Sequence, residues 1–141
     1  MPATPPNAYL RTKVMTASPA ELRLLLIDGA IRFAEQARTG LVEQDHEKMF
    51  NGATRCQDIV MELLTTLRPD QAPELCERLS ALYTYLYKRM VEGATTRDIK
   101  AVDEVLELLR YERETWVMLM DKLASDAGAA AAAPGAMSVQ G

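Results

Sequence analysis

The sequence has few of the residues that usually carry chemistry in an active site. It contains one histidine and two cysteines among 141 residues. The histidine, His46, stands between Asp45 and Glu47 in the expected polar first turn of a helix, which indicates a surface position and argues against catalysis or phosphotransfer. Di-iron helical bundles use two Glu-x-x-His motifs, and one histidine cannot supply both. The sequence therefore predicts a protein that is not an enzyme and that binds no cofactor and no metal.

Long hydrophobic runs and dense positive charge are also lacking. Uninterrupted apolar runs such as Leu24 to Ile27 are far shorter than the roughly 20 residues that cross a bilayer. The formal net charge is −4 and basic residues are interspersed with acidic ones, so no cationic face is available for phosphates. Cys56 and Cys76 lack C-x-x-C spacing and are expected to be buried thiols. We expect a cytoplasmic protein that neither inserts into a membrane nor binds nucleic acid.

The sequence does contain a strong helix start, which opens the most apolar segment of the chain, TASPAELRLLLIDGAIRFAEQA (residues 16–37). Ser18 can accept hydrogen bonds from the free N–H groups of a first turn, and Pro19 suits the position just inside it. Glu21 can reach back toward Ser18 and complete a capping box. A helix is therefore predicted to begin at Pro19, with Ser18, Pro19 and Glu21 in structural roles.

This helix carries more apolar surface than one seam of a small bundle requires. At 100° per residue, a second apolar stripe lies beside the main one and consists of Leu24, Ile27, Ile31 and Ala34. One interpretation is a central helix that other helices cover on two sides. The other interpretation is a second stripe left open for a partner helix.

Gly29 interrupts the inner stripe of the same helix, although a glycine in a helix interior costs about 1 kcal/mol relative to alanine. Another group is therefore expected to approach the backbone closely at this position. Tight packing of a facing helix, or of a ring such as Tyr83 or Trp116, is the expected cause, ahead of contact with a ligand. Gly29 and Trp116 are accordingly assigned structural roles.

Apolar residues that recur at three and four positions predict three further helices. The second helix should begin after the N-cap residue Asp45 and stop near Leu67, and the third should run from Pro73 to Gly93. The fourth should follow a capping signal formed by Thr95 and Asp98. Short connections make successive helices antiparallel, so the predicted fold is all-α, an up-down-up-down four-helix bundle over residues 18–124.

Both ends of the chain are predicted to lie outside this bundle. Residues 1–17 contain three prolines and little apolar periodicity, which favours a flexible arm over a helix. Tyr9 and Leu10 are among its few apolar side chains, so the arm either lies across the bundle or is a frayed terminus. Residues 125–141 are mostly alanine and glycine and are predicted to form a disordered tail.

Several of these segments resemble one known family. The segment at residues 16–37 closely resembles the opening-helix signature of the flagellar secretion chaperone FliS family. LYTYLYKRM at residues 82–90 and DEVLELL at residues 103–109 follow in the order of that family. The resemblance extends over about residues 9–123. It implies a four-helix bundle that holds the C-terminal segment of flagellin in the cytoplasm.

The resemblance further implies an export chaperone that prevents premature polymerisation of flagellin and keeps it competent for flagellar type III secretion through the export gate. The alternative is a helical adaptor or structural bundle that associates with itself, although a monomer is favoured. In the free protein the arm is expected to cover part of the client site through Tyr9. Residues expected to contact the client lie on the arm and on the first three helices: Tyr9, Leu10, Leu24, Ile27, Ile31, Phe50, Met61, Leu64, Tyr83 and Tyr87.

Overall fold

The computed structural model describes the backbone of residues 6–132 and the side chains of residues 8–129. Within these residues every regular element is an α-helix, which confirms the all-α class. The five helices are α1 (Pro6–Thr16), α2 (Pro19–Glu43), α3 (His46–Thr65), α4 (Pro73–Thr96) and α5 (Ile99–Ala132).

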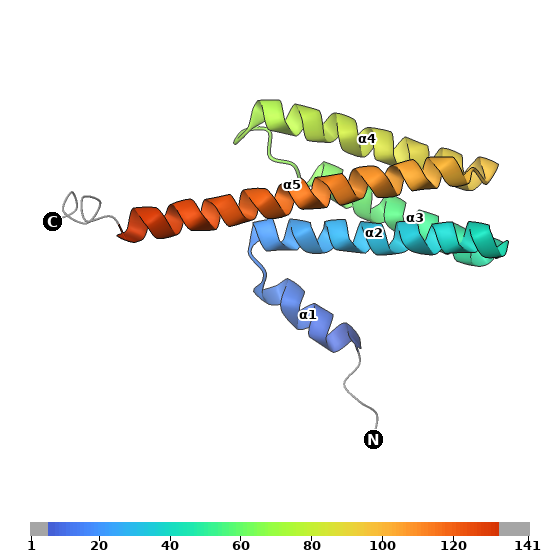
Figure 1. Cartoon of the computed structure of the whole chain (residues 1–141), viewed down its shortest axis with the longest axis horizontal. Coiled ribbons are helices and arrows are strands. Elements are labelled where there is room, and N and C mark those ends of the chain that lie inside the picture. The colour runs from blue at the N-terminus through green and yellow to red at the C-terminus, as the bar shows by residue number, and fades with distance from the viewer. Residues whose placement is uncertain (1–5, 133–141) are drawn as a thin grey trace, which may run out of the picture.

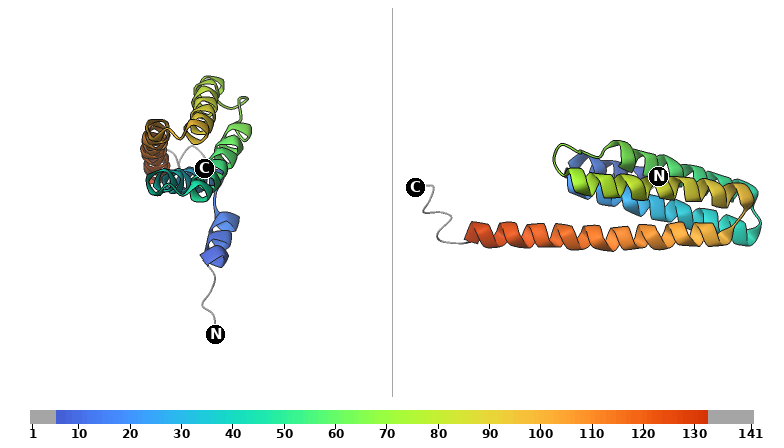
Figure 2. Two further views of the ribbon diagram at one scale, coloured as in Figure 1. Left: turned by 90° about the vertical axis from the view of Figure 1, so that its right-hand side faces the viewer. Right: turned by 90° about the horizontal axis from the view of Figure 1, so that it is seen from above.

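Four of these helices surround a common core (Figure 1). In this group α2 lies beside α3 and α5, and α4 lies beside the same two helices. Successive helices from α2 to α5 run in alternating directions, and Figure 2 shows the four helices end-on. The remaining helix, α1, stands away from the other four at the end where α2 begins.

Local capping groups place the helix starts where the sequence predicts them. The hydroxyl of Ser18 accepts a hydrogen bond from the N–H of Glu21 at 3.2 Å and donates one to the Glu21 carboxylate at 2.9 Å, so α2 begins directly after Ser18. At the start of α3, the Asp45 carboxylate accepts a hydrogen bond from the N–H of Lys48 at 3.0 Å. Pro73 opens α4, where its missing N–H leaves no helical hydrogen bond unmade.

The helix α4 does not end at Gly93, as the sequence predicts. This glycine is buried, and a Cβ on it would lie 3.1 Å from the Cβ of Ala101 and 3.0 Å from a methyl group of Val102. Gly93 therefore makes room for α5 and does not terminate α4. The helix instead ends at Thr96, and Arg97 takes the left-handed conformation with φ 54°.

Both ends of the chain contain more helix than the sequence predicts. Residues 6–16 form α1 and not an extended arm, because the prolines lie only at or before the first helical position. The helix α5 continues to Ala132, so the predicted disordered tail is helical from residue 125 up to that point. Alanine is the strongest helix former, and α5 extends beyond the neighbouring helices (Figure 1). Its side chains at residues 121–129 are exposed. The rest of the predicted arm and tail, residues 1–5 and 133–141, lies outside the described residues.

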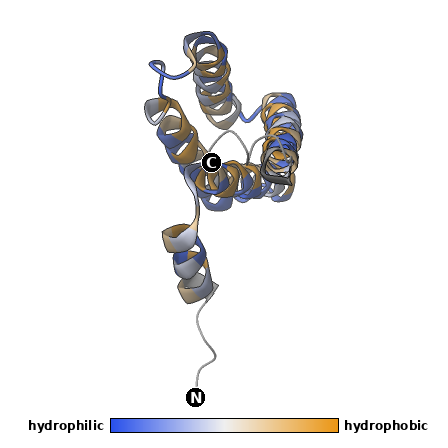
Figure 3. Cartoon of the chain, turned by 90° about the vertical axis from the view of Figure 1, so that its left-hand side faces the viewer, coloured by the Kyte–Doolittle hydropathy of each residue, from blue (hydrophilic) through white to orange (hydrophobic). Residues whose placement is uncertain are grey.

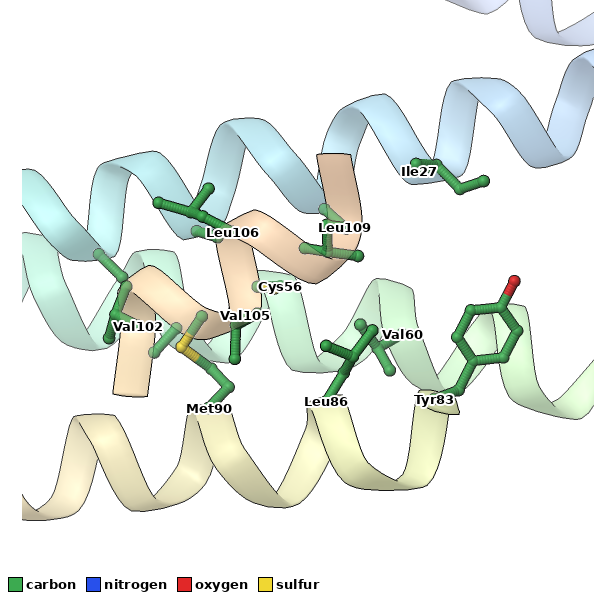
Figure 4. Close-up of a cluster of buried hydrophobic side chains, with 14 of the residues drawn as sticks. Ile27, Cys56, Val60, Tyr83, Leu86, Met90, Val102, Val105, Leu106 and Leu109 are labelled. Atoms are coloured by element: carbon green, nitrogen blue, oxygen red, sulfur yellow. The ribbon is translucent and has the colours of Figure 1, made fainter. Parts of the chain in front are cut away.

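The core contains apolar residues that the three-and-four spacing places on the inner sides of the helices. Val60 of α3, Leu86 of α4 and Leu109 of α5 belong to one buried cluster with Ile27 of α2 (Figure 4). Hydrophobic and hydrophilic residues separate onto different sides of these helices (Figure 3). Cys56 is buried in the cluster as a free thiol, and burial raises its pKa to about 12.

A very close contact joins α2 to α3, and two glycines make it possible. A Cβ on Gly52 would lie 2.6 Å from the backbone nitrogen of Ala37 and 2.7 Å from the carbonyl oxygen of Phe33. A Cβ on Gly40 would lie 2.7 Å from the Cα atom of Met49. These distances are well inside van der Waals contact, and backbone atoms cannot rotate away as the end of a side chain can. No larger residue fits at either position without moving one helix from the other.

The sequence predicts a close approach at Gly29, and the structure has one there, although it is less tight than those at Gly40 and Gly52. A Cβ on Gly29 would lie 3.2 Å from the Cδ1 atom of Ile59. The facing helix α3 is therefore the neighbour at this position, and the rings of Tyr83 and Trp116 are not. Since Cδ1 is the flexible end of a side chain, this contact is less restrictive than those at Gly40 and Gly52.

These contacts predict different costs for the same substitution. Gly52→Ala should destabilise the protein by about 1–3 kcal/mol, because the new Cβ overlaps the backbone of α2. Gly29→Ala should be close to neutral, because Ile59 can shift and alanine gains about 1 kcal/mol in helix propensity. Urea unfolding followed by circular dichroism measures both changes. Equal free energies of unfolding for the two variants would contradict the contact geometry.

Candidate functional site

Two of the residues expected to contact a client lie inside the core. Ile27 and Tyr83 are both fully buried. Ile27 is enclosed because α3 and α5 cover α2 from both sides. Tyr83 is enclosed because its hydroxyl finds hydrogen-bonding partners inside the molecule, which allows the whole ring to be buried. The prediction that these two residues lie on an exposed client site is therefore wrong.

Leu24 and Ile31, the other client residues expected on α2, are half-buried on the side that faces α5. Both lie within one turn of Asp28, whose carboxylate pairs with the guanidinium of Arg113 at 2.5 Å. Because α5 covers this side, the second apolar stripe is not left open. The structure agrees with the interpretation in which α2 is covered on two sides.

The edge between α2 and α5 is polar on its outer side. A hollow of about 840 Å³ on this edge is lined mainly by charged side chains. Ion pairs between half-exposed groups contribute about 1 kcal/mol or less each, but they leave little apolar area for a helical partner. Three such pairs cross from α2 to α5: Asp28–Arg113 at 2.5 Å, Glu35–Arg110 at 3.5 Å and Arg38–Asp103 at 2.5 Å.

The edge between α4 and α5 is also closed by polar contacts. The carboxylate of Glu104 accepts a hydrogen bond from the hydroxyl of Tyr85 at 2.7 Å and one from the guanidinium of Arg89 at 2.6 Å. These two bonds hold the pKa of Glu104 below its usual range, and the same carboxylate raises the pKa of Tyr85. This edge presents bonded polar groups and not free apolar side chains.

The helix α3 has one flank that takes no part in packing against α2. Gly52 and Ile59 define the flank that faces α2, through their contacts with its backbone and with Gly29. At 100° per residue, Phe50, Met61 and Leu64 lie on the other flank, toward α4. Phe50 is 62% exposed, although a large apolar aromatic side chain within a helix of a bundle is usually buried.

The helix α4 contributes the matching flank. Gly93 and Arg89 face α5, through contacts with Ala101 and Glu104 respectively, so Tyr87 and Val91 lie on the side toward α3. Val91 is exposed and Tyr87 is half-buried. We call the combined face the α3–α4 surface, and it consists of Phe50, Met61, Leu64, Tyr87 and Val91.

The α3–α4 surface gathers four of the ten residues expected to contact a client. It adds Val91, which the sequence interpretation missed although it follows Tyr87 by one helical turn. Within the part of the chain that the structure describes, no hydrogen bond or ion pair joins α3 directly to α4. Exposed apolar side chains without polar partners bind by removing area from water, at about 25 cal/mol per Å². Such a face suits the apolar side of an amphipathic helix.

The helix α1 carries the other two exposed client candidates. Tyr9 is 70% exposed and Leu10 is also exposed, and α1 does not lie on the α3–α4 surface (Figure 1). The expectation that Tyr9 anchors the arm over the client site in the free protein is therefore not met by this structure. A direct contact of Tyr9 and Leu10 with a client stays a prediction.

Sequence reasoning missed a buried polar network. Glu112 is only 8% exposed, and its carboxylate accepts a hydrogen bond from the Tyr83 hydroxyl at 3.0 Å. The guanidinium of Arg23 donates to the same hydroxyl at 3.2 Å. Burial raises the pKa of Glu112, and burial together with the nearby Glu112 charge raises the pKa of Tyr83 to about 12. One available signal was that Glu112 occupies a seam position between Leu109 and Trp116.

Trp116 connects the same region of α5 to the start of α2. Its ring N–H donates a hydrogen bond to the carbonyl oxygen of Ala20 at 2.9 Å, and the ring is half-buried.

Elsewhere, His46 is exposed, and the described residues contain no group of His, Cys, Asp or Glu side chains that could hold a metal. Among the same residues, none of the helices has the length and apolar character needed to cross a membrane.

The fold and the α3–α4 surface define a class of protein: a small helical bundle with an exposed apolar face. The family model of the flagellar protein FliS matches residues 2–123. The chain is 31% identical to the flagellar secretion chaperone FliS of Bacillus subtilis over 112 residues, which are 79% of this chain and 83% of the relative. The chain therefore belongs to the FliS family of flagellar secretion chaperones.

Two further similarities agree with this family. The chain is 30% identical to the flagellar secretion chaperone FliS of Escherichia coli over 110 residues, which are 76% of this chain and 79% of the relative. A crystal structure of a flagellar chaperone from bacteria superposes with a TM-score of 0.69 at 18% sequence identity. The match covers 82% of this chain and 97% of that chain, which shows that the two share a fold.

The raised pKa of Glu112 predicts how stability depends on pH. The folded protein holds this proton more tightly than the unfolded chain, so the stability that the group contributes falls as pH rises from its ordinary pKa of 4.5 through the raised value. Glu112→Gln removes this dependence. Its stability relative to the wild type should therefore increase between about pH 4 and about pH 7, as measured by urea unfolding.

The exposed Glu114 provides the matched control, because Glu114→Gln makes the same chemical change at a solvated position. Its difference from the wild type, measured over the same pH range, is the reference for Glu112→Gln. A Glu112→Gln difference that does not change with pH relative to this reference would show that burial does not perturb the Glu112 carboxyl.

Proposed function

We propose that this protein is a cytoplasmic export chaperone that binds the C-terminal segment of flagellin. It covers the apolar face of that segment, prevents premature polymerisation and keeps flagellin competent for flagellar type III secretion. The antiparallel four-helix bundle of α2–α5 is the binding unit, and the loaded one-to-one complex is received by the export gate. Membership of the FliS family supports a role in flagellar secretion.

The exposed apolar residues of the α3–α4 surface are the reason for proposing it as the binding site. Phe50, Met61 and Val91 are exposed there, and no direct polar contact between α3 and α4 has to be broken for a helix to pack on them. In contrast, ion pairs cross the α2–α5 and α4–α5 edges. A disordered amphipathic client can recover the cost of its ordering by burying its apolar face on this surface.

Binding alone is sufficient for this function, so the proposal involves no catalysis and no nucleotide. Among the described residues no group of His, Cys, Asp or Glu side chains could hold a metal, and the α3–α4 surface consists of Phe50, Met61, Leu64, Tyr87 and Val91. The strength of association then depends on how much apolar area the complex buries. Release of flagellin depends on the contacts that the complex makes at the export gate. Tyr9 and Leu10 of α1 supply a second exposed apolar group that can extend the contact with flagellin.

Calorimetric titration with a peptide of the C-terminal segment of flagellin from the same organism tests the proposal. We expect one-to-one binding with a negative heat-capacity change, because apolar area is buried. Phe50→Ala should weaken binding roughly tenfold without lowering the melting temperature appreciably, because the side chain is exposed. Tyr111→Ala is the matched control, since this aromatic residue of α5 is 70% exposed on the opposite side of the ring of helices.

Two results of this titration would contradict the proposal. Absence of binding by the wild-type protein at tens of micromolar peptide would remove the flagellin assignment. Equal losses of affinity in Phe50→Ala and Tyr111→Ala would remove the α3–α4 surface as the site.

The second candidate function is a helical adaptor that pairs with itself through the same exposed residues. Light scattering after size-exclusion chromatography distinguishes the two, because a closed dimer would bury the α3–α4 surface in a self-complementary contact. We expect a monomer of 15.6 kDa that forms a one-to-one complex when the flagellin peptide is added. A stable dimer that Phe50→Ala dissociates would favour the adaptor.

A further inference from the structure

One side chain of α2 connects the ends of two other helices. The guanidinium of Arg23 donates hydrogen bonds to the Thr66 hydroxyl at 3.1 Å and to the carbonyl oxygen of Leu63 at 3.1 Å, both at the C-terminal end of α3. It also donates to the hydroxyl of Tyr83 on α4 at 3.2 Å and lies 5.8 Å from the centre of that ring. The position of this one group therefore relates α3 to α4.

The second half of the network fixes the tyrosine from the other side. The Tyr83 hydroxyl donates a hydrogen bond to the Glu112 carboxylate of α5 at 3.0 Å. The lone pairs of the hydroxyl oxygen are therefore free to accept the hydrogen bond from Arg23. Charge-assisted hydrogen bonds thus link Arg23, Tyr83 and Glu112 in one network. The bond from Tyr83 to Glu112 is buried and the bond from Arg23 to Tyr83 is partly buried, and burial strengthens such bonds. All four helices of the bundle contribute a bonded group.

This network of hydrogen bonds lies at the end of the α3–α4 surface. Met61 and Leu64 stand on either side of Leu63 along α3, and Tyr87 follows Tyr83 by one helical turn on α4. In the described residues the direct contact of α3 with α4 is apolar, which does not define one spacing or register as directional bonds do. Arg23 supplies such bonds to the turns from which the surface residues project.

We propose that Arg23 is a positioning residue for the client site: it sets the spacing of α3 and α4 at the end of the α3–α4 surface without touching the client itself. This inference rests on the proposed function for its binding readout. The planar fork of arginine is essential, because it reaches three acceptors on two helices at once. A lysine ammonium offers one point of charge and cannot reproduce that geometry.

The test separates positioning from stability with two variants of the full chain. Arg23→Met keeps an apolar stem of similar length, but it leaves the buried Glu112 without its cation and should lower the melting temperature. Adding Glu112→Gln removes that unpaired charge, so the double variant should recover most of the lost stability. If Arg23 positions the surface, the double variant should still bind the flagellin peptide roughly tenfold more weakly than the wild type.

Hydrogen exchange measured by mass spectrometry supplies a readout that does not depend on the peptide. In the double variant, backbone amides at residues 61–66 and 83–91 should exchange faster than in the wild type, while those at the α2–α5 edge should not change. Arg23→Lys should give an intermediate affinity. Val105→Ala is the matched control, because it removes buried volume from α5 away from the network and should lower stability without a change in affinity.

The outcomes are distinct. Recovery of both stability and affinity in the double variant would overturn the proposal and leave Arg23 a structural residue. Failure of the wild-type protein to bind the peptide would count against the proposed function, and the exchange rates would still decide whether Arg23 fixes α3 against α4. Unchanged exchange at residues 61–66 and 83–91 would overturn the positioning role.

Discussion

The contact between α2 and α3 at Gly40 and Gly52 is the constraint on which the other helix positions depend. The absence of a Cβ at these glycines brings backbone against backbone, which fixes both the separation of the two helices and the rotation of α3 about its axis. Once that rotation is fixed, the flank with Phe50 and Met61 must face outward and toward α4. The location of the exposed apolar face therefore follows from where glycine occurs on the opposite flank of the same helix.

Much of the fold could be predicted from the sequence, because caps and apolar spacing are local signals. Ser18, Asp45 and Pro73 define helix starts through groups within one turn, and the structure has helices that begin there. Helix ends were less predictable. Glycine commonly ends a helix, but Gly93 instead makes room for Ala101 and Val102 of α5, and this contact forms only once α5 folds back against α4. The alanine-rich end of α5 has helix propensity without any core residue to reveal it.

The candidate site could be predicted only in part, since an apolar stripe does not state which helix will cover it. Leu24 and Ile31 on α2 look as available in the sequence as Met61 and Leu64 on α3, and α5 covers the first pair. The position of Tyr83 beside the apolar seam predicts a hydroxyl that reaches water or a partner, but Arg23 and Glu112 satisfy that hydroxyl within the core. Pairings between charged residues on separate helices have no local sequence signal.

Among the described residues no hydrogen bond or ion pair joins α3 directly to α4, which has a consequence for the range of sequences that the proposed client site accepts. Hydrogen-bonding groups at an interface fix the register of an occupant, because a displaced donor or acceptor is left unpaired. An aliphatic and aromatic face imposes no such penalty, and its energy depends mainly on the area covered. Helices whose apolar residues recur at the same spacing are therefore nearly equivalent occupants, so the face selects for periodicity more than for particular side chains.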